Sequence, residues 1–178
     1  MMDQAERRQF VRENRFCIWG YNRKNHGPAM TPGYYTMRDE EICYVSMAAR
    51  AKTKAALRDP RASICVIDEL RPPSYVQVFG KVRVERDLDQ VYDIFLRVIE
   101  NEMIVEGNTY SDEEAAAKKA ETMDFLRRED RIALILTPES TFFSPATRGN
   151  TLEEKYEFRS SLGEIGEGKV RVGSAMPW

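Results

Sequence analysis

The sequence predicts a mainly β (α+β) fold, an antiparallel barrel with peripheral helices. Six or seven short segments rich in apolar, aromatic and β-branched residues are separated by turn residues, which is typical of antiparallel strands. Only a few segments carry helical periodicity, and these lie between or outside the strand segments. With 178 residues the chain is long enough to bury a core. A small barrel with helical decoration fits this pattern best.

The first 47 residues predict a short helix followed by a meander of three strands. Asp3 is placed to cap a helix that runs to about Glu13. Tight turns join the strands, which are expected at 15–21, 29–37 and 41–47. Pro32 and Gly33 predict a break inside the second of these strands, because both residues interrupt regular pairing.

An alanine-rich basic helix is predicted next, directly after the third strand. Residues 48–58, AARAKTKAALR, are mostly strong helix formers. Asp59 should end the helix, because the following Pro60 disfavours the α conformation in the residue before it. Further strands are expected at 62–68 and 74–86. Gly80 in the second of them predicts a bulge or a close approach by another part of the molecule.

A helical insertion is predicted at about 88–129. Apolar residues recur at helical spacing over 88–101. Ser111 and Glu114 have the spacing of a capping box, which predicts the start of a second, highly charged helix. Two more strands are expected at 131–138 and 140–144. The rest of the chain is polar and dotted with glycine, and it carries little core-forming pattern.

Charge and cysteine content narrow the class of protein. The chain has 27 basic and 29 acidic residues and a net charge of −2, which argues against binding of polyanions by the molecule as a whole. The chain has three cysteines: Cys17, Cys43 and Cys65. They form no Cys-x-x-Cys pair or Cys/His cluster, so we expect no metal site. Buried reduced thiols are expected instead, which favours a cytoplasmic location. No apolar run approaches the roughly 18 residues of a membrane span, and the first residues are too charged for a signal peptide.

The junction between the strand ending at Ser46 and the basic helix is the candidate binding site. Free backbone N–H groups and the positive end of the helix dipole favour an anion there. Ser46, Arg50 and Lys52 would complete a phosphate cradle. On the helix, Arg50, Lys54 and Arg58 share one face, and Lys52 points roughly away from it. The alternative is that this face is only solvated, and the residues by themselves leave both interpretations open.

Five motifs follow one another in a recognisable order: FVRENR (10–15), TPGYY (31–35), ICYVS (42–46), RAKTKAALRDPRASICV (50–66) and YVQVFGKVRVERD (75–87). This series resembles the pyridoxamine 5′-phosphate oxidase-like superfamily of flavin-binding split β-barrels, which includes enzymes that use the deazaflavin F420. The FVRENR segment is similar to the F420-type branch. The resemblance covers the first half of the chain and implies an antiparallel split β-barrel.

The resemblance implies a cofactor site at several positions. In the family, a strand that ends in Ser or Thr and an Arg-x-Lys that follows it bind the cofactor phosphate, which points to Ser46, Arg50 and Lys52 here. The flavin or deazaflavin ring would lie beside three residues of the TPGYY motif: Thr31, Pro32 and Tyr34. The family often has tryptophan at the position of Tyr34.

Two further contacts are expected from residues inside the two longest motifs, 50–66 and 75–87. The extra basic residues Lys54, Arg58 and Arg61 would meet the acidic tail of F420, whereas in an FMN-binding protein they would form a solvated face. The resemblance also implies that Gln77 would reach the cofactor of a partner subunit. The family commonly has asparagine where this chain has Ala55, so one expected helix contact is missing.

The implied function is an FMN- or F420-dependent oxidoreductase that transfers hydride or electrons to a small organic substrate. The family implies a homodimer with cofactor at the subunit interface. The split-barrel domain would span 1–148, and 149–178 would be an extension that contacts the dimer partner or is flexible. The alternatives are a non-catalytic flavin- or haem-binding module and nucleic-acid binding by the basic helix face, which the net charge disfavours. The choice between FMN and F420, the substrate and the catalytic residues stay open.

Overall fold

The structure is a computed structural model that describes residues 2–68, 73–102, 111–144 and 176–178. Four helices are present in these ranges: α1 (Gln4–Glu13), α2 (Ala51–Arg58), α3 (Leu88–Glu102) and α4 (Asp112–Arg128). The strands are β1 (Phe16–Tyr21), β2 (Ala29–Tyr34), β3 (Thr36–Arg38), β4 (Glu41–Met47), β5 (Arg61–Ile67), β6 (Tyr75–Glu85), β7 (Arg131–Ser144) and β8 (Met176–Pro177). No described helix has the length and apolarity that crossing a bilayer requires.

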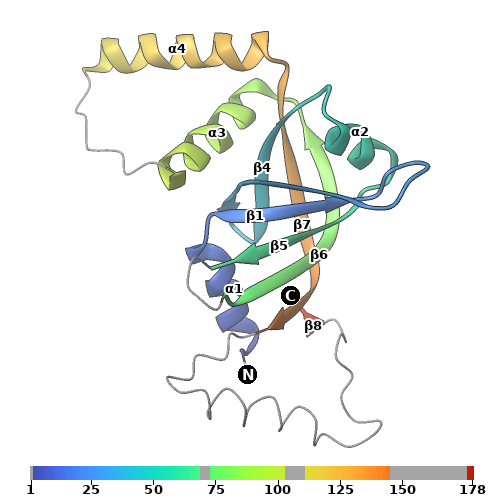
Figure 1. Cartoon of the computed structure of the whole chain (residues 1–178). Coiled ribbons are helices and arrows are strands. Elements are labelled where there is room, and N and C mark those ends of the chain that lie inside the picture. Colours follow the sequence, from blue (N-terminus) through green and yellow to red (C-terminus); the bar gives the residue numbers. More distant parts are fainter. Residues whose placement is uncertain (1, 69–72, 103–110, 145–175) are drawn as a thin grey trace, which may run out of the picture.

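The strands form one curled antiparallel sheet (Figure 1). Its order is β2-β1-β5-β6-β7-β4-β3, and β8 pairs with β7 outside this path. β2 and β3 therefore lie at the two ends of the order, and the sheet curls without joining them, as a split barrel does. The predicted mainly β fold, an antiparallel split barrel with peripheral helices, is confirmed.

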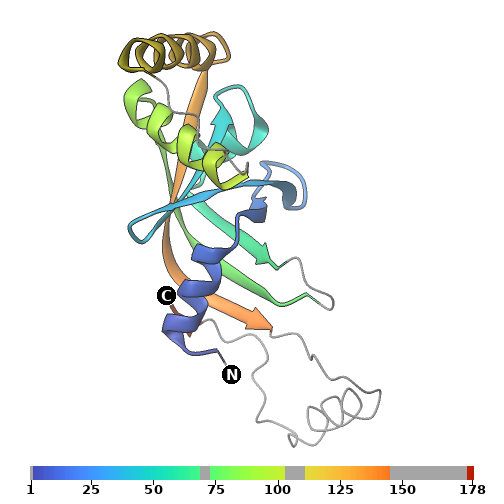
Figure 2. The same ribbon diagram turned by 90° about the vertical axis from the view of Figure 1, so that its left-hand side faces the viewer.

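Apolar side chains pack on both faces of the sheet. The inner cluster fills the curl and includes Trp19, Tyr35 and Ile64, with Val11 of α1 packed among them. α1 lies at the end of the sheet away from α3 and α4 (Figure 2). Its Val11 carbonyl accepts a hydrogen bond from the Tyr35 hydroxyl at 2.6 Å. α1 is thus part of the core, and its predicted cap is confirmed, because Asp3 forms a capping box with Glu6.

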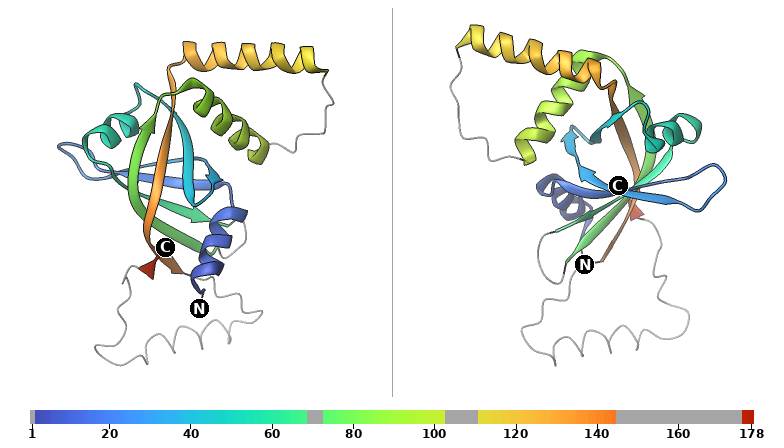
Figure 3. Two further views of the ribbon diagram at one scale, coloured as in Figure 1. Left: turned by 180° about the vertical axis from the view of Figure 1, so that it is seen from behind. Right: turned by 45° about the horizontal axis from the view of Figure 1, so that its top comes forward.

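The outer cluster joins α3 and α4 to the other face of β4 and β7. Val91, Ile94 and Val98 of α3 pack with Leu126 of α4 and with strand residues such as Ile135. α2 and the α3–α4 pair lie on opposite sides of β6 and β7 in both views of Figure 3. The two helices predicted within 88–129 are therefore present, and they lie across the sheet from α2.

Two strands predicted at 131–138 and 140–144 form a single strand, β7. Its register with β6 shifts because Phe79 pairs with Ser140 and Gly80 pairs with Pro138. One extra residue of β7, Glu139, is accommodated there, which is the geometry of a bulge. A Cβ at Gly80 would collide with the backbone of β7. The bulge predicted at Gly80 is therefore confirmed, whereas the division of β7 into two strands was wrong.

The break predicted at Pro32 and Gly33 was also wrong. β2 runs through both residues, which pair with Ile18 and Cys17 of β1, and the chain leaves the strand only at Tyr35. Pro32 fits because β2 is an edge strand, where a residue without an N–H group need not interrupt a ladder.

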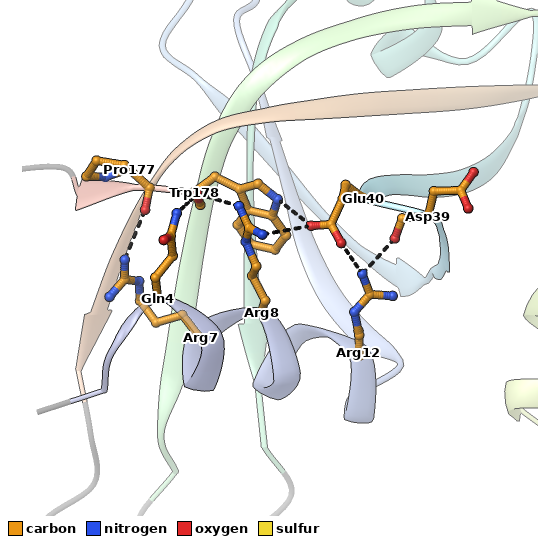
Figure 4. A network of polar contacts seen from close by, with 8 residues as sticks. All are labelled: Gln4, Arg7, Arg8, Arg12, Asp39, Glu40, Pro177 and Trp178. Atoms are coloured by element: carbon orange, nitrogen blue, oxygen red, sulfur yellow. Dashed lines mark hydrogen bonds and ion pairs between the residues drawn. The ribbon is translucent and has the colours of Figure 1, made fainter.

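The last described residues return to α1, which the sequence did not predict (Figure 4). Arg7 is 5% exposed, and its guanidinium donates to the Thr141 hydroxyl at 2.8 Å and to the Pro177 carbonyl at 2.9 Å. The Trp178 carbonyl accepts from Arg8 at 2.7 Å. The Trp178 indole N–H donates to Glu40 at 3.2 Å. Trp178 therefore anchors the tail, and the predicted extension contacts its own chain here; residues 145–175 lie outside the described ranges.

We expect Arg7→Met to lower the free energy of unfolding by about 2–4 kcal/mol, because Thr141 and Pro177 lose a charged hydrogen-bond donor in a buried place. Arg12→Met on the same helix removes an exposed ion pair with Glu40 and should cost less than about 1 kcal/mol. Urea denaturation of both variants measures the difference. An equal decrease in the free energy of unfolding in the two variants would show that the buried contacts of Arg7 stabilise the protein no more than those of a surface arginine.

Candidate functional site

A cleft of about 560 Å³ lies where β4 leads into α2. It is lined by Tyr21, Thr31, Pro32, Tyr44, Val45, Ser46, Met47, Ala49, Arg50, Ala51, Lys52 and Arg131. Five of the eight residues predicted for the cofactor site are among them: Thr31, Pro32, Ser46, Arg50 and Lys52. The strand-to-helix junction proposed from the sequence therefore opens into a cavity.

α2 begins later than the sequence predicted. Residues 48–50 form a turn, and the first helical residue is Ala51. Arg50 is the N-cap, but no side chain caps the helix, and its first turn contains no acidic residue. The first N–H groups of a helix have no partner within the helix, and they carry a partial positive charge. The cleft therefore receives an uncapped helix start beside two basic side chains, those of Arg50 and Lys52.

Lys52 is the buried cation of this site. Its side chain points away from the exposed Arg50, Lys54 and Arg58, as the helical spacing predicted, and the residue is 9% exposed. Its Nζ donates to the Tyr44 hydroxyl at 2.8 Å and lies 4.3 Å from the centre of the Tyr44 ring. Among the described residues no carboxylate forms an ion pair with it. Because burial disfavours the charged form, the pKa of Lys52 is lowered to about 8.

Tyr44 holds a position that depends on a glycine. Its ring packs against Trp19 with centroids 5.2 Å apart, and its hydroxyl donates to the Pro32 carbonyl at 3.3 Å. The hydroxyl lies directly over Gly33, where a Cβ would collide with it. Gly33 is therefore required by a close approach of Tyr44 across the sheet.

Thr31 places a polar atom without a partner beside the cleft. Its Oγ1 is buried and makes no hydrogen bond with any described residue. A buried hydroxyl without a partner costs free energy, so native structures rarely keep one without a reason. The atom fits a site in which a polar group of a ligand completes its hydrogen bonding.

Ser46 lines the cleft but is engaged with α2. It is 5% exposed, and its Oγ lies 3.2 Å from Oγ1 of Thr53. Thr53 also donates to the Met47 carbonyl at 2.8 Å. A hydroxyl has one proton to donate, so Ser46 is the natural donor in its own contact with Thr53. Its main structural role is to join the end of β4 to α2.

The other three predicted residues do not line the cleft. Tyr34 is 44% exposed and contacts Phe16 edge-on, with ring centroids 5.7 Å apart. Lys54 is exposed on the solvent side of α2. Gln77 is partly buried on β6, in register with Cys65 and Phe142. A contact of Gln77 with the cofactor of a partner subunit stays a prediction.

Sequence reasoning missed Arg131, a third basic residue of the lining. Arg131 begins β7 and is the register partner of Met47 at the end of β4. Its guanidinium donates to Glu129 at 2.6 and 2.9 Å, so part of its charge is balanced. The sequence shows an arginine at the start of a strand, but only the pairing of β7 with β4 brings it to the cleft.

The lining contains no histidine, cysteine or carboxylate, and its side chains that can take part in acid–base chemistry are Lys52, Tyr21 and Tyr44. The chain has one histidine, His26, which is exposed in the loop between β1 and β2 and does not line the cleft. Burial raises the pKa of the Cys17 thiol to about 12, so it is neutral at ordinary pH. The lining therefore supports binding and orientation of an anionic ligand, and Lys52, whose pKa is lowered to about 8, is a group there that exchanges a proton near ordinary pH.

The profile of a family described as pyridoxamine 5′-phosphate oxidase matches residues 3–127 of the chain. The fold is similar to that of several solved proteins. A conserved hypothetical protein from Mycobacterium tuberculosis is 19% identical with a TM-score of 0.64, over 86% of this chain and 95% of the other. An FAD-binding protein from Mesorhizobium loti is 16% identical with a TM-score of 0.57, over 79% and 92% of the two chains.

An F420 reductase also has a similar fold. It is 17% identical with a TM-score of 0.54, over 75% of this chain and 94% of the other. No curated protein matches the sequence. At these identities the solved structures support the fold alone.

We expect Thr31→Val to raise the free energy of unfolding of the ligand-free protein by about 1 kcal/mol, because it removes a buried hydroxyl that has no described partner. Thr141→Val is the matched control, since its buried hydroxyl accepts from Arg7 and its loss should destabilise the protein. Urea denaturation measures both. A loss of stability in Thr31→Val comparable to that of the control would show that the Thr31 hydroxyl has a structural partner.

Proposed function

The chain belongs to the pyridoxamine 5′-phosphate oxidase family, and on that premise we propose that it binds FMN or F420 in the cleft and acts as an oxidoreductase on a small organic molecule. One observation carries the proposal. Lys52 is a buried cation without a described carboxylate partner, and it lies in a cleft at the uncapped start of α2. An unneutralised cation beside free helix N–H groups suits the phosphate of a nucleotide-like cofactor.

The phosphate would lie against the first turn of α2. Arg50 and Lys52 offer charged donors there. Ala49 and Ala51 also line the cleft, and their small side chains let a ligand approach the backbone closely. Ser46 supports this arrangement by tying β4 to α2 through Thr53.

The ring of the cofactor would lie along β2, beside Thr31 and Pro32. The Thr31 hydroxyl supplies a donor and an acceptor that no described residue uses. When bound, a flavin-type cofactor supplies hydride or electron-pair transfer. The protein's own part is to bind and orient the cofactor and to keep water from the ring, which agrees with a lining that lacks histidine.

A second subunit would complete the site. Met30 is 74% exposed on the edge strand β2, and Tyr34 on the same strand is also exposed. Thr31 and Pro32 of that strand line the cleft, so a partner that covered Met30 and Tyr34 would also border the cofactor. The contact of Gln77 with the partner's cofactor stays part of this proposal because the family resemblance implies it, and we retain 1–148 as the cofactor domain and 149–178 as an extension.

The basic face of α2 bears on the choice of cofactor. Lys54 and Arg58 are exposed beside the cleft residue Arg50. FMN ends at its phosphate, whereas F420 continues into an acidic tail that these side chains would attract. The contribution of Lys54 and Arg58 to binding affinity therefore distinguishes F420 from FMN.

We expect Lys52→Ala to weaken cofactor binding by about 1–3 kcal/mol, because it removes a charged hydrogen-bond donor. Quenching of FMN and F420 fluorescence measures the two affinities. Lys54→Ala is the matched control, since it changes the same residue type on the same helix outside the cleft lining. It should leave FMN affinity unchanged and weaken F420 binding if the acidic tail lies along α2.

If the wild-type protein binds neither FMN nor F420, the proposal is refuted. If a cofactor binds, reduction or reoxidation of the bound cofactor with a panel of small organic substrates tests the enzymatic part. Binding without any turnover would instead favour the non-catalytic binding module.

Affinity for the cofactor should fall as pH rises through about 8. The free protein loses the Lys52 proton near that pH, whereas a bound phosphate stabilises the ammonium and raises its pKa. Binding therefore requires uptake of a proton above pH 8 and is fully favourable below it. Titrations between pH 7 and 9.5 measure this dependence. Lys52→Arg keeps its charge over this range and should bind without the alkaline loss; a loss identical to the wild type would assign the effect to another group.

A further inference from the structure

A lysine side chain is long and flexible, so a buried lysine needs a group that fixes its ammonium. Lys52 has one such group among the described residues. The Tyr44 hydroxyl accepts from Nζ at 2.8 Å, and the Tyr44 ring lies 4.3 Å from it. The ring face attracts a cation, and the hydroxyl fixes its direction. Two N–H groups of the ammonium remain for a ligand.

Tyr44 is itself fixed by contacts on two other strands. Its hydroxyl donates its single proton to the Pro32 carbonyl of β2, which leaves the oxygen lone pairs to accept from Lys52. Trp19 of β1 packs against its ring. The absence of a side chain at Gly33 lets the hydroxyl lie over β2. A chain of contacts thus runs from β2 through Tyr44 to α2.

We infer that Tyr44 is a positioning residue. Its hydroxyl holds the Lys52 ammonium toward the cleft, so that the ammonium is already oriented when an anionic ligand binds. The inference rests on the proposed function, because it names how the proposed phosphate contact is prepared. It gives Tyr44 a role through Lys52 and requires no contact between Tyr44 and the ligand.

The charged and titratable groups around Lys52 support this assignment. Two groups act on the Lys52 charge without a hydrogen bond: Cys17 of β1 raises the pKa of Lys52, and Arg50 on the same helix lowers it. Arg131 of β7 lines the same cleft and is paired with Glu129. Burial also disfavours the ammonium. Of the neighbours named here, Tyr44 is the group that favours a charged Lys52 through a direct hydrogen bond.

Tyr44→Phe tests the inference, because it removes the hydroxyl and keeps the ring. In the ligand-free protein, acetylation of Lys52 followed by mass spectrometry as a function of pH measures the pKa of this amine. The variant should lower that pKa by about one, since the ammonium loses a hydrogen-bond acceptor. Tyr35→Phe is the control, because it removes another buried phenol hydroxyl, one that bonds to Val11. An unchanged Lys52 titration in Tyr44→Phe would overturn the inference.

A double-mutant cycle with FMN, or with F420 if only F420 binds, completes the test. Tyr44→Phe should weaken binding about threefold to tenfold when Lys52 is present and should have no effect in the Lys52→Ala background. Equal weakening in both backgrounds would show direct contact with the ligand and would overturn the positioning role. If the wild type binds neither cofactor, the proposed function fails, and the acetylation titration alone decides whether Tyr44 holds Lys52.

Discussion

The contact between Lys52 and Tyr44 is the interaction on which the site depends. An ammonium removed from water must find oxygen or ring partners, because its desolvation would otherwise drive it neutral. Tyr44 meets this need from β4, and it reaches Lys52 only because Gly33 leaves room on β2. One side chain therefore links two strands to the helix that borders the cleft, and the curl of the sheet is what brings these three elements together.

Sequence patterns predicted the local structure well because local physics determines it. Asp3 and Ser111 cap the helices that they were expected to cap, and Gly80 marks a bulge. The errors arose where pairing partners decide the outcome. Pro32 was expected to break a strand, but an edge strand tolerates it. The two strands expected after 130 are one, since a bulge at Glu139 continues the ladder with β6.

For the candidate site too, the sequence predicted the local features and missed those that depend on strand pairing. The junction after Ser46 was predicted because an anion site at a strand-to-helix boundary is a local feature, and the burial of Lys52 follows from helical spacing. The orphaned hydroxyl of Thr31 and the presence of Arg131 were outside the reach of sequence, since both depend on which strands pair. The motif order supplied the family that these residues alone did not identify.

Successive residues of β4 pack alternately in the inner and the outer hydrophobic cluster. Ile42 and Tyr44 belong to the inner cluster, whereas Cys43 and Val45 pack under α3 and α4. Neighbouring side chains on a strand point to opposite faces, yet Val45 also lines the cleft together with Tyr44. The helical pair therefore borders the cleft indirectly, through Val45 of β4 and through Arg131 of β7, whose guanidinium lies 5.6 Å from the centre of the Phe125 ring of α4. A change in the packing of α3 and α4 would act on the shape of the cleft through these two residues.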